Sequence, residues 1–209
     1  MEFYPINLRL EDKKVLVVGG GKVAYRKLKR LVKVRARVTV VGPQIIKEVE
    51  DLIKEAKVEY HNRSFFDCDI HGYFLIIAAT DNKEVNARIG ELADQKGILV
   101  NIVDDKELSN FTLPSVVNRG DLLLTISTGG NLPALSKKLR IALEKEFGEE
   151  YGEYLKLMGD VRELVKEQVD DEGKRRDIFK RLAKLEMVEL FLRDREEAVG
   201  KIDQIIGEG

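Results

Sequence analysis

The segment from Val15 to Ala24, which reads VLVVGGGKVA, constrains the fold more than any other part of this chain. Four apolar residues lead into three glycines, and a helix-like sequence begins at once at Lys22. A strand, a glycine turn and a helix in this order form the unit that holds the pyrophosphate of a dinucleotide. The segment therefore predicts an α/β fold with a Rossmann-like parallel sheet.

Each small residue of this pattern, Gly19, Gly21 and Ala24, has a different structural role. Gly19 turns the chain where a side chain would clash, Gly21 lets the backbone approach a phosphate, and Ala24 lets the helix pack closely on the strand. The N–H groups at the start of the helix favour an anion, because they have no partners within the helix. The alternative is a tight turn that binds no ligand.

Composition narrows the class of protein. The 209 residues suffice for a nucleotide-binding domain and a smaller one, and 44% apolar residues suit a globular core. Charged residues make up 35% of the chain but balance to a net charge of −1, which argues against a general nucleic-acid binder. Cys68 is the only cysteine, so no internal disulfide can form, and we expect a bystander thiol.

No apolar run approaches the ~20 residues that a membrane-spanning helix needs. The first residues, MEFYP, lack the basic and apolar stretches of a signal peptide. We therefore expect a soluble, cytoplasmic protein that acts on neither membranes nor nucleic acid.

Strand-like and helix-like segments alternate through the first half of the chain. Apolar strands in such an alternation predict a parallel sheet covered on both faces, with ligands at the carboxyl ends of the strands. The expected strands are 14–18, 37–41, 58–61, 73–79 and 98–103, and the expected helices are 23–32, 45–56 and 83–96. Gly97 is expected to close the last helix in a left-handed conformation.

The pattern changes after Val103. Two strands are expected at 111–117 and 122–127, followed by a helix at 132–147 and by polar helices near 149–169, 172–185 and 188–206. The expected organisation is a nucleotide-binding domain over residues 1–112, a small β/α region over 113–147 and a helical domain over 148–209.

The end of the second strand bears on the choice of cofactor. Pro43 and Gln44 follow it, without the acidic residue that often holds the ribose of NAD or the arginine that accommodates NADP. We expect Gln44 or backbone groups to bind the ribose, and NAD rather than NADP as the cofactor.

Two other strand ends carry polar side chains. Thr80 and Asp81 can hydrogen-bond a cofactor after the fourth strand, although Asp81 could instead cap the helix that follows. After the fifth strand, the carboxylate of Asp104 or Asp105 is placed to act as a general base on a substrate beside the nicotinamide. The alternative there is a polar loop whose aspartates are solvated.

Residues 127–133, STGGNLP, form a second glycine turn before a helix, and its N–H groups can bind substrate carboxylates. The alternative is an ordinary helix start capped by Asn131. His61 and His71 are the only histidines, and they match no metal-ligand spacing, so no protein-held metal is expected.

Five short motifs follow one another along the chain: VVGGGKVAYRK at 17–27, AATD at 78–81, NIVD at 101–104, FTLPS at 111–115 and STGGNLP at 127–133. Together they resemble the precorrin-2 dehydrogenases and the same module of siroheme synthases. The resemblance runs from about Tyr4 to Arg140, and the helical tail fits in length.

The resemblance implies an enzyme that oxidises precorrin-2, a carboxylate-rich reduced tetrapyrrole, to sirohydrochlorin with NAD. Some members then insert ferrous iron to give siroheme, and the motifs leave that second reaction open. The resemblance also implies a homodimer whose interface is formed by the middle region, 113–147.

The site residues of the family can be carried over by position. Its cofactor contacts map onto Gly21, Lys22, Val23, Pro43 and Gln44, and its catalytic aspartate maps onto Asp104. A substrate with several carboxylates needs cationic or N–H partners. The expected partners in this chain are Arg119, Lys137 and the turn formed by Thr128, Gly129 and Gly130.

Arg35 departs from the family pattern, because a glycine usually precedes the second strand. The departure suggests that a left-handed residue has been lost there.

A non-catalytic NAD-sensing module is the alternative class of protein, since it needs a glycine turn but no carboxylate beside the nicotinamide. A dehydrogenase for a small hydroxy acid is disfavoured by the lack of a catalytic histidine.

Overall fold

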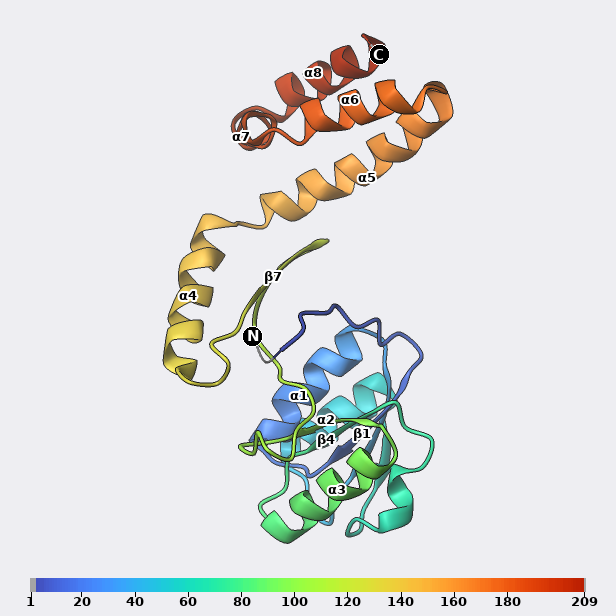
Figure 1. The fold of residues 1–209 in the computed structure, drawn as a ribbon, viewed down its shortest axis with the longest axis vertical. Helices are drawn as coiled ribbons and strands as arrows, with labels where there is room; N and C mark the ends of the chain where they lie inside the picture. The colour runs from blue at the N-terminus through green and yellow to red at the C-terminus, as the bar shows by residue number, and fades with distance from the viewer. Residues whose placement is uncertain (1–2, 209) are drawn as a thin grey trace. The chain divides into compact units, whose positions relative to one another are not determined.

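A five-stranded parallel sheet organises the first half of the computed structural model, which describes residues 3–208 (Figure 1). Its strands are β1 Lys14–Val18, β2 Arg37–Val41, β3 Glu59–His61, β4 Leu75–Ala78 and β5 Leu99–Ile102, in the spatial order β3-β2-β1-β4-β5. The chain moves outward from β1 to β3 and then crosses to β4 on the other side of β1. This switch point between β1 and β4 is where such sheets bind ligands.

The sheet is buried on both faces. Val15 and Val17 of β1 belong to one apolar cluster, which also contains residues of α1 Lys22–Lys33 and α2 Lys47–Ala56. Leu16 and Val18 belong to a second cluster, with residues of α3 Lys83–Gln95. Alternate residues of a strand point to opposite faces, so burial on both faces explains why the sequence of β1 is apolar throughout.

The second half of the chain combines a hairpin with helices. Strands β6 Ser115–Arg119 and β7 Leu122–Ile126 pair antiparallel, and the helices are α4 Pro133–Glu146, α5 Glu150–Gln168, α6 Glu172–Leu182, α7 Leu185–Arg193 and α8 Arg195–Gly207. A separate apolar core forms among α5 to α8, around Tyr154, Val165 and Ile202. No described helix is long and apolar enough to cross a bilayer.

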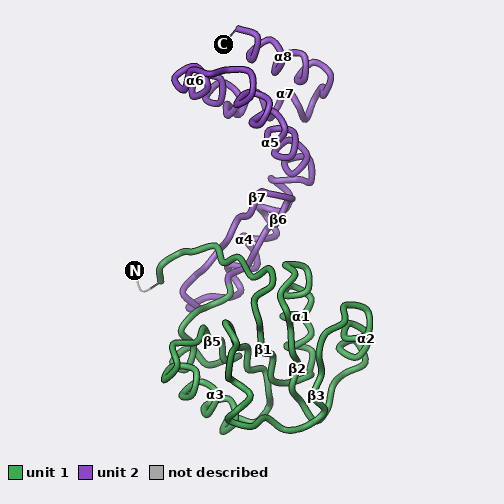
Figure 2. Tube along the Cα trace, turned by 90° about the vertical axis from the view of Figure 1, so that its right-hand side faces the viewer, with its two compact units in different colours: residues 1–113 green, residues 114–209 purple. Residues whose placement is uncertain are grey.

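The chain divides into two compact units, residues 1–113 and 114–209 (Figure 2). We call them the first and the second unit. The expected division of the second unit near residue 147 stays a prediction.

The predicted fold class is confirmed, with local corrections. The helix expected at 188–206 is two helices, because Asp194 is extended, with φ −148°, and its side chain accepts a hydrogen bond from the Glu197 N–H to start α8. The strand expected from Phe111 begins only at Ser115, after Pro114. Gly97 is left-handed as expected, with φ 63°.

The expectation for Arg35 was wrong. Arg35 keeps the left-handed conformation, with φ 57°, although it has a side chain. Its N–H donates to the Val32 carbonyl at 3.0 Å, and the N–H of Ala36 donates to the Leu31 carbonyl at 3.1 Å. These backbone hydrogen bonds close the end of α1 in the way that a glycine usually does.

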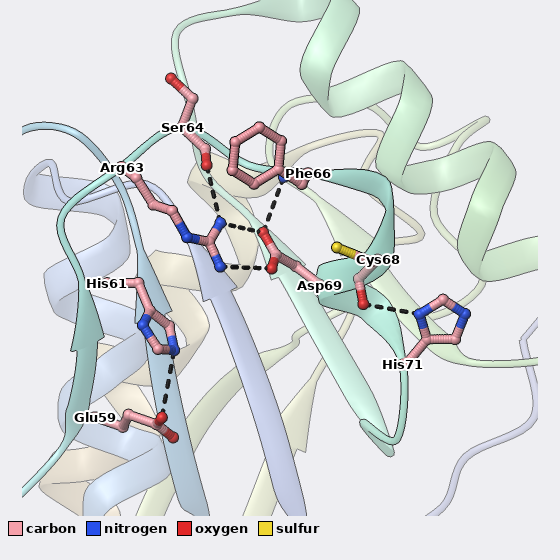
Figure 3. A network of polar contacts seen from close by, with 8 residues as sticks. All are labelled: Glu59, His61, Arg63, Ser64, Phe66, Cys68, Asp69 and His71. Atoms are coloured by element: carbon pink, nitrogen blue, oxygen red, sulfur yellow. Dashed lines mark hydrogen bonds and ion pairs between the residues drawn. The ribbon is translucent and has the colours of Figure 1, made fainter.

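A bidentate ion pair holds the loop between β3 and β4 (Figure 3). Both guanidinium nitrogens of Arg63 lie 2.7 Å from the carboxylate oxygens of Asp69, which also accepts the Phe66 N–H at 2.9 Å. The Asp69 side chain is only 10% exposed. The hydrogen bonds from Arg63, and then that from the Phe66 N–H, hold the pKa of Asp69 below its usual value.

Replacing Asp69 by Asn should therefore destabilise the protein by about 1–3 kcal/mol at pH 7, because it breaks a largely buried, charge-assisted pair. Since the folded-state pKa is lowered, this contribution is present above about pH 4, the unfolded value, and is lost as pH falls through the folded pKa. Denaturant unfolding of the wild type and the variant, followed by circular dichroism from pH 7 to pH 3, measures the difference.

The matched control is Asp67→Asn. Asp67 pairs with Arg88 at 2.6 Å, but both side chains are about half exposed, so its loss should destabilise the protein much less than the loss of Asp69. Equal losses for the two variants would contradict the structural role of the Arg63–Asp69 pair.

Candidate active site

The glycine turn brings the ends of three strands together. Gly19 has φ 111°, which residues with side chains rarely adopt, and its N–H donates to the Val41 carbonyl at 2.8 Å. A Cβ at Gly19 would lie 2.3 Å from the carbonyl oxygen of Ala79. The turn after β1 is therefore packed between the ends of β2 and β4, as the predicted role of Gly19 requires.

Gly20 has a packing role that the sequence pattern missed. A Cβ there would lie 2.4 Å from Cγ2 of Ile45 and 2.5 Å from the Gln44 carbonyl oxygen. Its own carbonyl accepts the Ile46 N–H at 3.0 Å. Gly20 thus lets the segment after β2 pack against the turn. The run of three glycines was the feature of the sequence that could have indicated this role.

Gly21 differs from its neighbours because it faces open space. A Cβ on Gly21 would meet no atom within 4 Å, and Gly21 is the N-cap residue of α1, with no side chain capping the helix. The first turn of α1 also contains no acidic residue. Its N–H groups and its dipole are therefore uncompensated, and the geometry fits the pyrophosphate of a dinucleotide.

The segment after β2 offers polar groups without an acid. The Gly42 N–H donates to the His61 carbonyl at 3.2 Å, and the Tyr60 hydroxyl donates to the Gly42 carbonyl at 2.9 Å. Pro43 and Gln44 follow and are exposed. Both residues are therefore accessible, and their cofactor contacts stay predictions.

The start of α3 rules out one of the two roles that the sequence left open for Asp81, that of capping this helix. Asn82 caps the helix, because its Oδ1 accepts the N–H groups of Glu84 and Val85 at 2.9 and 3.1 Å. The Asp81 side chain is not the cap. It is exposed, and it makes no hydrogen bond or ion pair within residues 3–208, so it stays available to a ligand.

Thr80 has internal partners in the same turn. Its hydroxyl lies 2.7 Å from the side-chain oxygen of Asn86, and the Asn86 amide donates to the Thr80 carbonyl at 3.0 Å. This arrangement stiffens the turn. The predicted cofactor contact of Thr80 stays a prediction.

The two aspartates after β5 play different parts. The Oδ1 of Asp105 accepts the Leu108 N–H at 3.1 Å, so that carboxylate shapes the loop. Asp104 is left-handed, with φ 63°, and exposed, and its carboxylate makes no hydrogen bond or ion pair in the described chain. An exposed carboxylate without an internal partner, at the carboxyl end of a parallel strand, is available to a ligand. Of the two candidates, the geometry favours Asp104.

Side chains from the following loop complete the open edge of β5. The N–H groups of Val100 and Ile102 donate to Asn110 Oδ1 at 2.8 Å and to Ser109 Oγ at 2.9 Å. The Asn101 amide donates to the Phe111 carbonyl at 3.2 Å. This loop holds the Asp104 turn in place, and its role was not visible in the sequence.

A cleft of about 680 Å³ opens beside Asp104 in the first unit. One wall is a face of α1 that carries Val23, Lys27 and Arg30, and the other is the segment after β5. Burial, and then the neighbouring charges of Arg30 and Arg26, lower the pKa of Lys27, while Asp104 opposes the change. The cleft therefore has an acidic side chain, Asp104, on one wall and positively charged side chains of α1 on the other.

The second unit holds the residues predicted to bind the substrate. Arg119 is 15% exposed, and its guanidinium donates to the carbonyls of Phe147 at 2.8 Å and Glu144 at 3.0 Å. These contacts satisfy backbone carbonyls at the C-terminal end of α4, so the geometry favours a structural role for Arg119. Its substrate contact stays a prediction.

The turn before α4 has the expected glycine conformations, with φ 58° at Gly129 and 76° at Gly130. Asn131 is not the cap, because Leu132 occupies the N-cap position without a side-chain hydrogen bond. Thr128 Oγ1 accepts the Leu132 N–H at 3.4 Å, and Lys137 is exposed on α4. Substrate binding by this turn and by Lys137 stays a prediction.

The two histidines make local contacts in Figure 3. His61 lies 3.3 Å from Glu59, and Nδ1 of His71 lies 2.8 Å from the Cys68 carbonyl. Within residues 3–208 no group of three or more His, Cys, Asp or Glu is arranged to hold a metal ion. Cys68 is a free, exposed thiol.

This chain is similar to several known proteins. A family profile described as putative NAD(P)-binding matches residues 6–115. A siroheme synthase of Thioalkalivibrio sulfidiphilus is 39% identical over 198 residues, which is 95% of this chain and 40% of that protein. A siroheme synthase of Vesicomyosocius okutanii is also 39% identical, over 79% of this chain and 36% of that protein. The chain thus spans about two fifths of the length of these relatives.

A solved structure is similar over the whole chain. It is that of SirC, precorrin-2 dehydrogenase, with a TM-score of 0.82 and 26% identity, and the match covers 97% of this chain and 100% of that one. The chain therefore belongs to the putative NAD(P)-binding family, and it is similar to the precorrin-2 dehydrogenase SirC and to part of the siroheme synthases.

Proposed function

We propose that this protein oxidises precorrin-2 to sirohydrochlorin with NAD as the hydride acceptor. The observation that carries the proposal is the uncommitted Asp104 carboxylate in a cleft at the sheet edge that bears the glycine turn. The similarity to SirC and to siroheme synthases supports the choice of substrate. An NAD-sensing module would not need this carboxylate.

Different residues of the chain bind the cofactor and accept the proton. When bound, NAD supplies the acceptor for a hydride. The open face of Gly21 and the first-turn N–H groups of α1, at Lys22 and Val23, hold its pyrophosphate and set its position. Oxidation of the ring releases a hydride and a proton in net terms, and Asp104 is the base that takes the proton.

We propose NAD rather than NADP because the segment after β2 offers no cation for a 2′-phosphate. Pro43 and Gln44 are the exposed residues there, and the two arginines near this strand, Arg35 and Arg37, lie before or at its start and pair with Glu11 and Asp12.

We also propose that the protein is a homodimer that forms through the second unit. Apolar side chains are exposed there on β7 and α4, at 40–43% of their area for four of them: Leu123, Leu135, Leu139 and Ile141. Exposed apolar side chains gathered on adjacent elements are typical of protein interfaces.

The direct test mixes the purified protein with precorrin-2 and either NAD or NADP under anaerobic conditions. Formation of sirohydrochlorin and NADH, seen in the absorbance spectrum, supports the proposal. NAD binding without turnover would favour a sensing module instead. A further arm with sirohydrochlorin and ferrous iron, compared with the spontaneous rate, measures iron insertion.

Replacing Gly21 by Asp should weaken NAD binding by at least about 100-fold, because bulk and negative charge fill the pyrophosphate site. The fold should persist, since a Cβ at Gly21 meets no protein atom and its φ is −85°. Calorimetric titration with NAD measures the affinity, and thermal melting checks the fold. Gly159→Asp, also in open space but on α5, is the control. Unchanged affinity in Gly21→Asp would refute the pyrophosphate site.

Replacing Asp104 by Asn should lower kcat by about 10²–10⁴-fold, because Asn cannot accept the proton. Asn tolerates the left-handed backbone, so the turn should survive and NAD affinity should stay unchanged. Steady-state kinetics with precorrin-2 measure the loss. Asp105→Asn is the matched control, because an amide oxygen can still accept the Leu108 N–H. Parental turnover in Asp104→Asn would remove Asp104 from the mechanism.

A further inference from the structure

Four cations of α1 line one wall of the cleft, and one of them, Lys29, lies over the Tyr25 ring at 5.5 Å. Arg26, Lys27 and Arg30 lie within about one turn of α1, and all three line the cleft whose other wall carries Asp104. Arg26 and Arg30 are four residues apart, a spacing at which like charges repel one another. The wall therefore accumulates positive charge at an energetic cost.

No carboxylate of the described chain neutralises this wall. Arg26, Lys27 and Arg30 make no ion pair and no side-chain hydrogen bond within residues 3–208, and Asp104 interacts with Lys27 only over a longer range. In the same unit, four other arginines each pair with a carboxylate: Arg35, Arg37, Arg63 and Arg88. The unpaired cluster is suited to an anion from outside the chain.

The cofactor does not account for the whole cluster. Arg30 is nine residues beyond Gly21, which is about 13 Å along the helix axis. The pyrophosphate at the helix start is therefore too far away to meet Arg30. Burial, and then the charges of Arg30 and Arg26, lower the pKa of Lys27, so a nearby anion would favour the charged form of this lysine.

We propose that Arg26, Lys27 and Arg30 form a subsite that binds carboxylates of the tetrapyrrole and so holds its ring against Asp104. This proposal rests on the proposed function and assigns it a substrate-binding wall in the first unit. A guanidinium binds a carboxylate in a bidentate way, so two arginines and a lysine can hold acidic groups that project from one edge of the ring.

The test uses the double variant Arg26→Gln/Arg30→Gln of the full chain. Its Kd for sirohydrochlorin, from a visible absorbance titration, should rise at least about tenfold, and its KM for precorrin-2 should rise in parallel. The Kd for NAD should stay the same. Added salt should weaken sirohydrochlorin binding less in the variant than in the wild type, because fewer ion pairs remain to be screened.

Lys27 is tested separately. Lys27→Gln should also raise the Kd for sirohydrochlorin, and Lys27→Arg should restore most of the affinity, because it keeps the charge. The matched control is Lys14→Gln/Lys33→Gln, which removes two exposed charges of the first unit that do not line the cleft. This control should bind sirohydrochlorin as the wild type does.

The outcomes separate the two proposals. If the wild type oxidises precorrin-2 but the double variant binds sirohydrochlorin with unchanged Kd, the subsite is wrong and the proposed function stands. A loss of NAD affinity in the double variant would assign the cluster to the cofactor and overturn the subsite. If the wild type neither binds sirohydrochlorin nor oxidises precorrin-2, the proposed function itself fails.

Discussion

The close approach of three loops at Gly19 and Gly20 is the constraint on which the rest of the first unit depends. A single added carbon at either position would overlap Ala79, or Gln44 and Ile45, at 2.3–2.5 Å. Because both side chains are absent, the ends of β1, β2 and β4 meet. Gly21 and the start of α1 then face open space, so the same turn that closes the core also leaves main-chain N–H groups for a ligand.

Asp104 and the basic face of α1 complete this arrangement from opposite sides of one cleft. The acid is held by backbone geometry and by a loop that is hydrogen-bonded to β5, whereas the bases are held by a helix that begins at the glycine turn. Both walls therefore take their position from the sheet. Charges of opposite sign on rigid supports can orient a polyanionic substrate and still leave one carboxylate free to accept a proton.

The sequence allowed the first unit to be predicted well because its strands are buried on both faces. Strands 14–18 and 37–41 coincide with β1 and β2, since their apolar runs end sharply at polar or glycine residues. The break at Asp194 was missed although five charged residues at 193–197, RDREE, interrupt the apolar pattern there. The choice between Asp104 and Asp105 also needed the structure, since only the Leu108 contact separates two adjacent carboxylates. The basic wall was missed for a similar reason: Arg26, Lys27 and Arg30 look in sequence like any solvated helix face.

The side chains that cover the edge of β5 have a consequence for assembly. Ser109 and Asn110 occupy outward-facing N–H groups of that strand, so another chain cannot add to the sheet there. The opposite edge, β3, is only three residues long and gives a poor template. Growth of the first unit by sheet extension is thereby suppressed at both margins. Within residues 3–208 the β6–β7 ribbon pairs with no further strand. The outer backbone groups of this ribbon are therefore the ones that a strand of a neighbouring chain could pair with.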